Sequence, residues 1–216
     1  MKNINNNDFK KKFQRKIDKI MTEFADGFLF TADIKKAVAI FGSSRISQES
    51  HHYKEARHLS NLLAKEKFTV VTGGGLGIMK AANRGAFEAG GNSIGINIQL
   101  PEYQPQNKYV TKSIRFNHFF IRKVMFSSAC RGFVFFPGGF GTLDEFFEIV
   151  DLSQNKKLDG PSVIVVVGKD YWQPLFDWLE KNVCQKHKAI NKDDLKIFYL
   201  VDSAKEALEI IKKHTY

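Results

Sequence analysis

The feature that most constrains the fold is an alternation of short apolar runs with helical stretches from about Lys36 onward. Runs such as Ala37–Phe41 lack alternating polar residues, which predicts strands that are buried on both faces. Strands of this kind, each followed by a helix, indicate a doubly wound, Rossmann-like α/β fold with a parallel sheet and helices on both faces. The strands are expected at 37–41, 68–72, 93–97, 132–136, 162–167 and 197–201, and the helices at 51–66, 78–89, 117–129, 171–183 and 204–214. Residues 101–116 are expected to be irregular.

The length and composition of the chain favour one folded body. With 216 residues, 43% of them hydrophobic, and no linker rich in Pro or Ser, we expect a helical extension at 1–35 and a single Rossmann-like domain at 36–216. No apolar run approaches the roughly 18 residues of a membrane span, and the start Met1–Asn7 lacks the apolar core of a secretory signal. A cytoplasmic protein without membrane contact is therefore expected. Cys130 and Cys184 show neither metal-ligand spacing nor a disulfide pattern, so we expect free thiols and no metal.

Half of the net charge of +10 lies in residues 1–20, where seven Lys and Arg residues accompany two Asp residues. A basic segment of this kind could bind nucleic acid. Apolar residues nevertheless recur at helical spacing on the other side of the segment: Phe9, Phe13, Ile17, Ile20, Met21 and Phe24. This pattern predicts an amphipathic helix over about 8–28 that packs on the body or on a partner subunit, and it makes nucleic acid an unlikely partner.

Two glycine-rich loops follow expected strands. One is Gly73-Gly74-Gly75-Leu76-Gly77, and the other is Pro137-Gly138-Gly139-Phe140-Gly141, which leads into a helix that is expected to start near Thr142. Glycines allow a ligand to approach the backbone closely, and the start of a helix favours an anion. Both loops and Ser43 are expected at the carboxyl ends of the strands, where such sheets bind ligands. Neither the dinucleotide fingerprint nor the P-loop pattern is present, so we expect a mononucleotide-sized site without NAD.

Thr142-x-x-Glu145 admits two interpretations. It is the pattern of a capping box, in which both side chains satisfy free N–H groups at the helix start. It would also place the Glu145 carboxylate beside a phosphate or sugar bound at the loop. The local pattern alone supports both readings equally.

Three motifs together resemble the LOG (Lonely guy) family of cytokinin-activating phosphoribohydrolases, which are also labelled possible lysine decarboxylases. The motifs are Gly73 to Met79 followed by Ala82, the pair Arg122-Lys123, and Pro137-Gly138-Gly139-Phe140-Gly141-Thr142-x-x-Glu145. The resemblance implies hydrolysis of the N-glycosidic bond of an adenine-type nucleoside 5′-monophosphate, without a cofactor, by at least a dimer. It places Arg122 and Glu145 at the catalytic positions. The residues expected to bind substrate are Ser43, Gly74, Gly75, Met79, His118, Lys123, Gly138, Gly139, Gly141 and Thr142.

The chemistry of these residues is consistent with that reaction. Cleavage at the anomeric carbon passes through an oxocarbenium-like state, which the Glu145 carboxylate could stabilise while it activates water. Arg122 stays charged and suits binding of a carboxylate or phosphate, whereas His118 could contact substrate or belong to a packed interface. Apolar surface on the helix around Arg122 and on the N-terminal helix favours a homodimer or a higher even oligomer. The alternative is a non-catalytic nucleotide sensor or nucleic-acid-binding protein, which would not require Glu145.

Overall fold

The computed structural model of the protein describes residues 6–101 and 105–215, and only the backbone of residues 6–9 and 215. The expectations that concern the chain start, the Phe9 side chain and residues 102–104 lie outside this description. The strands are β1 Ala37–Phe41, β2 Thr69–Thr72, β3 Ser93–Ile98, β4 Lys112–Phe116, β5 Gly132–Phe135, β6 Val163–Val167 and β7 Phe198–Val201. The α-helices are α1 Asn6–Thr31, α2 His51–Lys65, α3 Ile78–Glu88, α4 Phe119–Ala129, α5 Phe140–Gln154, α6 Lys169–Trp178 and α7 Ala204–Thr215.

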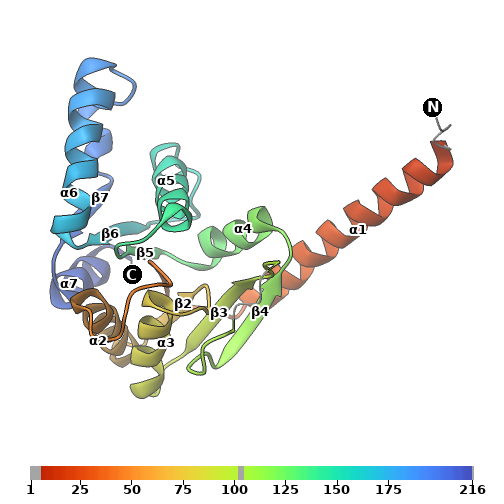
Figure 1. Cartoon of the computed structure of the whole chain (residues 1–216), viewed down its shortest axis with the longest axis horizontal. Helices are drawn as coiled ribbons and strands as arrows, with labels where there is room; N and C mark the ends of the chain where they lie inside the picture. Colours follow the sequence, from red (N-terminus) through yellow and green to blue (C-terminus); the bar gives the residue numbers. More distant parts are fainter. Residues whose placement is uncertain (1–5, 102–104, 216) are drawn as a thin grey trace.

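The strands form one parallel sheet in the order β4-β3-β2-β1-β5-β6-β7 (Figure 1). The chain runs outward from β1 to β4, returns to the middle of the sheet at β5, and then runs outward to β7 on the other side. The predicted doubly wound, Rossmann-like fold is therefore confirmed. The direction of winding reverses between β1 and β5, so the loops that follow these two strands border the crevice where such folds bind ligands.

The core consists of two hydrophobic clusters, one on each face of the sheet. Val38 and Ile40 of β1 pack with α2, α3 and α7, whereas Ala37, Ala39 and Phe41 of the same strand pack with α4, α5 and α6. All five residues are buried. The absence of polar alternation in the sequence therefore follows from coverage of both faces by helices.

One strand lies where the sequence predicted irregular chain. Residues 112–116 form β4, which pairs in parallel with β3 from Ile94↔Lys112 to Ile98↔Phe116. This edge strand exposes Lys112, Ser113 and Arg115 and buries only Phe116, so it lacks the apolar run of an internal strand. Exposed charges are a common feature of edge strands, because they discourage pairing with other chains.

The helix expected at 171–183 is also different in the structure. The α-helix α6 begins two residues earlier, at Lys169, and ends at Trp178. A π-helix, Leu179–Lys186, continues directly from it, and a short 3₁₀-helix, Lys192–Lys196, precedes β7. The wider π-helical turn changes the hydrogen-bonding pattern without changing the side-chain pattern strongly enough to be read from sequence.

The helix α1 projects from the body over its first half (Figure 1). Its second half packs against α4 and β4, where Ile20, Phe24 and Phe30 join the cluster on that face of the sheet. The expected packing of this amphipathic helix on the body is therefore found only for its second half. None of the described helices combines the length and the apolar character that a membrane span requires.

Candidate active site

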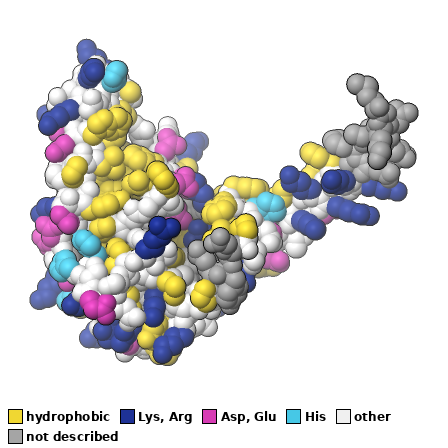
Figure 2. Space-filling view, in the orientation of Figure 1, with side chains coloured by type: hydrophobic (Ala, Val, Ile, Leu, Met, Phe, Trp, Pro, Cys, Tyr) yellow, Lys and Arg dark blue, Asp and Glu magenta, His cyan; other side chains and the backbone are white. Residues whose placement is uncertain are grey.

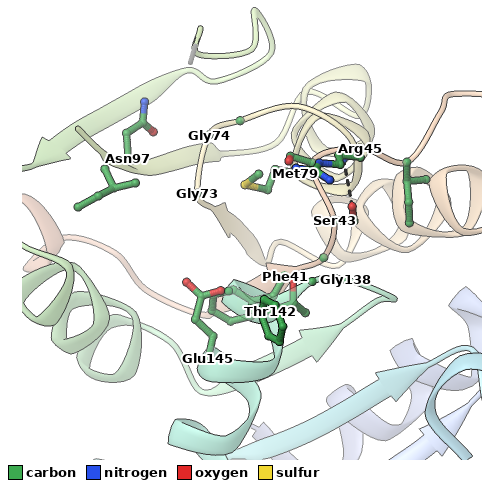
Figure 3. Close-up of a pocket in the computed structure, with 18 of the residues that line it drawn as sticks. Phe41, Ser43, Arg45, Gly73, Gly74, Met79, Asn97, Gly138, Thr142 and Glu145 are labelled. Carbon is green, nitrogen blue, oxygen red and sulfur yellow. Dashed lines mark hydrogen bonds between the residues drawn. The ribbon is translucent and has the colours of Figure 1, made fainter. Parts of the chain in front are cut away.

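A cavity of about 740 Å³ lies at the carboxyl ends of β1, β2 and β5 (Figure 3). The loops that follow these three strands supply much of its wall. Ten of the twelve residues selected from the sequence line this cavity: Ser43, Gly74, Gly75, Met79, Arg122, Gly138, Gly139, Gly141, Thr142 and Glu145. The structure therefore brings together segments that are far apart in the sequence, at the reversal point of the sheet.

One wall of the cavity is the start of α5. This helix begins at Phe140 with Gly139 as its N-cap, so the first free N–H groups of the helix lie at the glycine loop. Thr142 is buried beneath the loop, and a Cβ atom at Gly138 would overlap its side chain. A backbone with free N–H groups and no nearby Cβ atoms is suited to an oxyanion such as a phosphate.

The capping-box interpretation of Thr142 and Glu145 is wrong. Because α5 starts at Phe140, two residues before the expected position, Glu145 lies in its second turn. The N-cap residue is a glycine, and the structure shows no side-chain hydrogen bond to the cap. The Glu145 side chain is directed to the cavity instead (Figure 3).

The opposite wall is the glycine loop after β2. Gly74 has a φ of +73°, a conformation that favours glycine, and a Cβ atom at this position would overlap the Asn97 side chain. The Asn107 amide donates hydrogen bonds to the carbonyl oxygens of Gly74 (3.1 Å) and Gly75 (2.9 Å), and to Asn83 Oδ1 (2.9 Å). Thr72 Oγ1 donates to the same Asn83 oxygen over 2.7 Å. A buried, hydrogen-bonded network thus fixes the shape of this loop.

Arg122 and Glu145 form a buried ion pair in the cavity. Their side chains are 11% and 14% exposed, and Arg122 Nη1 lies 3.1 Å from Glu145 Oε1. Arg122 Nε also donates to the carbonyl oxygen of Ile96 over 2.8 Å, which connects α4 to β3. Because an unpaired charge at this depth would be costly, each residue holds the other in place.

The electrostatic environment of Glu145 favours its neutral form. Burial raises the pKa of this carboxyl to about 7, although the positive charge of Arg122 opposes the effect. Burial also lowers the pKa of Arg122, which nevertheless stays charged near neutral pH. A carboxyl group in a cavity with a pKa near 7 has the property expected of a general acid or base.

His118 and Lys123 do not belong to the lining of the cavity. His118 is the N-cap residue of α4, and its Nδ1 lies 3.2 Å from Glu23 Oε2 of α1. The same carboxylate accepts hydrogen bonds from the backbone N–H groups of Asn117 (3.2 Å) and His118 (3.3 Å). Burial opposes ionisation of Glu23, but the hydrogen bonds from Asn117 and His118 outweigh it and lower the pKa. Glu23 therefore caps the helix that carries Arg122.

Lys123 points to the outer side of α4, toward α5. Its Nζ lies 3.1 Å from Asp144 Oδ2 and 3.1 Å from Glu148 Oε2. The two neighbouring basic residues of the Arg-Lys motif therefore face in different directions. Arg122 faces the cavity, and Lys123 ties α4 to α5 beside it.

Further residues of the cavity could not be selected from the sequence. Tyr171 of α6 lines the cavity, and its hydroxyl donates a hydrogen bond of 2.5 Å to the Gly138 carbonyl oxygen. Arg45, Asn97 and Arg115 also line it. Among these residues, Arg45 and Asn97 offered a signal in the sequence, because both lie at the carboxyl end of an expected strand, as the glycine loops do.

Together, these features define a Rossmann-like α/β protein with a glycine-lined crevice and a buried carboxylate–guanidinium pair. The chain belongs to the family described as possible lysine decarboxylase, whose sequence model matches residues 79–211. The resemblance to the LOG family is confirmed by relatives in that family. The model of DNA recombination-mediator protein A also matches, over residues 2–135.

Several curated relatives carry the name cytokinin riboside 5′-monophosphate phosphoribohydrolase, and two of them illustrate the similarity. The protein from Rhodococcoides fascians is 24% identical over 148 residues, which cover 67% of this chain and 74% of that protein. A protein from Arabidopsis thaliana is 25% identical over 181 residues, which cover 83% of this chain and 78% of that protein. Both alignments therefore include most of the relative as well as most of this chain.

Solved structures confirm the fold. A molybdenum cofactor binding protein from Rippkaea orientalis superposes with a TM-score of 0.63 at 22% identity, over 83% of this chain and 96% of that one. The molybdenum cofactor carrier protein from Chlamydomonas reinhardtii gives a TM-score of 0.61 at 20% identity, over 83% and 97%. At this level of identity, the likeness concerns the fold alone.

Proposed function

We propose that this protein hydrolyses the N-glycosidic bond of adenine-type nucleoside 5′-monophosphates, such as a cytokinin riboside monophosphate or AMP, and releases the free base and ribose 5-phosphate. The observation that carries the proposal is the buried Glu145 carboxyl, which lies in the cavity next to Arg122 and the start of α5. The names of the curated relatives support the same reaction. Glu145 and Arg122 are the residues to which we assign catalysis.

Glu145 would act at the anomeric carbon. In the reaction, the bond between C1′ and the base nitrogen breaks, and its electron pair leaves with the base, which takes up a proton. The sugar passes through an oxocarbenium-like state, and the oxygen of a water molecule adds to C1′. An ionised Glu145 stabilises the positive charge of that state and accepts a proton from the attacking water. Release of this proton from Glu145 regenerates the carboxylate and balances the proton that the base takes up.

The glycine loops would hold the phosphate. The N–H groups at the start of α5 and the positive end of its dipole are directed to the loop of Gly138 and Gly139. Tyr171 fixes the orientation of the Gly138 peptide through its hydrogen bond to the carbonyl oxygen. Arg122, which cannot act as an acid, would orient Glu145 and contact the nucleotide.

Two other activities have less support. Decarboxylation of lysine with pyridoxal phosphate requires a lysine that forms a Schiff base, and no lysine is among the described residues that line the cavity. The basic residues of α1 and the match to DNA recombination-mediator protein A favour a nucleotide sensor or a nucleic-acid-binding protein. Such a protein does not need a buried carboxyl group beside the anion-binding loop.

Chromatography of the reaction products tests the proposal. The purified protein is incubated with AMP, prenylated AMP and the corresponding nucleosides, and released base is quantified. We expect base from at least one monophosphate and much less from its nucleoside, because the glycine loops bind the phosphate. Equal turnover of the phosphorylated and unphosphorylated forms would refute the role of the loops, and no release from any member of the panel would refute the proposed reaction.

A further inference from the structure

The projecting helix α1 carries an exposed apolar ridge. The ridge consists of Phe13 (57% exposed), Ile17 (39%), Met21 (60%) and Phe28 (49%). These residues follow one another at intervals of four or seven positions, so they lie on one side of the helix. Figure 2 shows hydrophobic side chains along this helix beside a row of basic ones.

The ridge continues onto the body of the molecule. Phe24 of α1 and Phe120 of α4 pack with their ring centroids 6.1 Å apart, and Phe120 remains half exposed. The first half of α1 extends beyond this junction (Figure 1). A helical segment as short as the first half of α1 is only marginally stable in water by itself. The exposed apolar ridge therefore indicates a surface that is covered in the assembled protein.

The charges of α1 indicate what covers the ridge. Residues 6–19 contain six Lys or Arg and two Asp, whereas residues 20–31 contain no basic residue and two acidic ones, of which Asp26 is exposed and Glu23 is engaged by the start of α4. A parallel pair of such helices would place the two basic halves side by side. An antiparallel pair places each basic half along the acidic half of the other helix and also opposes the two helix dipoles.

We propose that α1 is a self-association surface, on which α1 of a second copy of this chain packs in antiparallel orientation about a twofold axis near Met21. A twofold axis pairs the same patch on both copies, which suits a ridge that is continuous along the helix. In this arrangement Phe13 of one copy lies opposite the partner's Phe28. The basic half of each helix then covers the junction of α1 and α4 on the other copy.

The first test is the mass of the full-length protein in solution, measured by light scattering. The double variant Phe13→Glu and Ile17→Glu places like charges in the ridge and is expected to halve the mass of the assembly. Thr22→Glu is the matched control, because Thr22 is exposed on α1 outside the ridge. A parental mass in the double variant, or a parental protein of 24.7 kDa, would overturn the proposal. Far-ultraviolet circular dichroism confirms that each variant is folded.

The second test determines the orientation of the helices by disulfide cross-linking. Cys130 is buried, so Phe13→Cys and Phe28→Cys are introduced separately into a Cys184→Ser background. Oxidation of a mixture of the two proteins is expected to give a cross-linked pair of one F13C and one F28C chain, distinguishable by a size tag. Cross-linking of F13C only with itself would indicate a parallel pair, and no cross-link would indicate another interface. Either result overturns the proposal, whatever the catalytic activity.

Discussion

At the scale of single residues, the proposed chemistry depends on the charge of Glu145. Glu145→Gln keeps the length of the side chain and an oxygen that can accept the hydrogen bond from Arg122, but it removes the charge. We expect turnover to fall by about a hundredfold or more, equivalent to roughly 2.7 kcal/mol of activation free energy, because the oxocarbenium-like state loses its counter-charge. Steady-state kinetics measure the loss.

Binding and stability measurements distinguish this role from a structural one. Ribose 5-phosphate or nucleotide should still bind to Glu145→Gln, and its melting temperature should stay close to that of the parental protein. A variant that melts normally and hydrolyses at nearly the parental rate would leave Glu145 without a catalytic role.

The environment of Glu145 also predicts a pH dependence. Because the pKa of this carboxyl is about 7 and the ionised form is the active one, kcat/KM should rise as the pH increases through about 7. The positive charge of Arg122 lowers that pKa, so Arg122→Gln should move the rise to higher pH in addition to reducing the rate. The measurement is a pH profile of kcat/KM for both proteins.

Arg115→Gln is the matched control for the pH profile. This arginine also lines the cavity, but its Nη1 donates a hydrogen bond to Gln99 Oε1 over 3.3 Å and not to Glu145. Arg115→Gln should therefore leave unchanged the pH at which kcat/KM rises. An unchanged profile in Arg122→Gln would show that the ion pair does not set the titration of Glu145.

At the scale of elements, the shape of the glycine loop after β2 depends on Asn107. Asn107→Ala removes the three hydrogen bonds that a buried amide donates and the one that its oxygen accepts from the N–H of Tyr109, and we expect it to cost about 1–3 kcal/mol of stability. The Michaelis constant for the nucleotide should rise more than turnover falls, since Arg122 and Glu145 lie on other elements. Chemical denaturation and steady-state kinetics test both effects.

An exposed asparagine provides the comparison for this variant. Asn155 makes hydrogen bonds only at the end of α5, so Asn155→Ala should change neither quantity appreciably. If Asn107→Ala changed stability but left the Michaelis constant at the parental value, the network would support the fold without shaping the loop for its ligand.

The sequence predicted those elements whose residues are buried by neighbours on both sides. β1 and β6 are continuous apolar runs because helices cover both of their faces. Such runs can be recognised as strands from the sequence alone. β4 was not predicted, since an edge strand with one buried residue has no such run. The start of α5 was misplaced because the chain enters the helix through Gly139, whose backbone needs no capping side chain.

The candidate site was predictable where its residues follow a strand directly. Gly74 and Gly138 were selected for this reason, and both line the cavity. Asn107 and Tyr171 were missed because their contacts to the loops span about 33 residues of sequence and leave no local pattern. His118 was selected for its position one turn before Arg122, but its partner is Glu23, which is 95 residues away.

At the scale of the whole molecule, α1 is both an extension and part of the body. Its first half projects, whereas its second half caps α4 through Glu23 and approaches it closely at Gly27. A Cβ atom at Gly27 would lie 3.1 Å from the ring of Phe116 and overlap Met125. The part of the extension that stabilises the body of the molecule is therefore expected to begin near residue 20.

Two truncations test this division. Deletion of residues 1–19 should leave the free energy of unfolding per chain nearly unchanged, because Ile20, Glu23 and Phe24 keep their contacts with the body. Deletion of residues 1–31 removes the Glu23 cap, worth about 1 kcal/mol, and exposes the apolar side chains beneath the second half of α1, for a total loss of several kcal/mol. Chemical denaturation compares the two proteins at a concentration where both are monomeric.

A point substitution measures the contribution of Glu23 to the free energy of unfolding separately from the apolar contacts of α1. Glu23→Ala in the full-length chain leaves the apolar contacts intact and should cost about 0.5–2 kcal/mol, because the N–H groups of Asn117 and His118 lose their acceptor. Since Arg122 lies one turn into α4, this variant should also weaken nucleotide binding. Equal stabilities for the two truncated proteins would show that the body folds independently of α1, and an unaffected Glu23→Ala variant would show that the start of α4 needs no cap from outside.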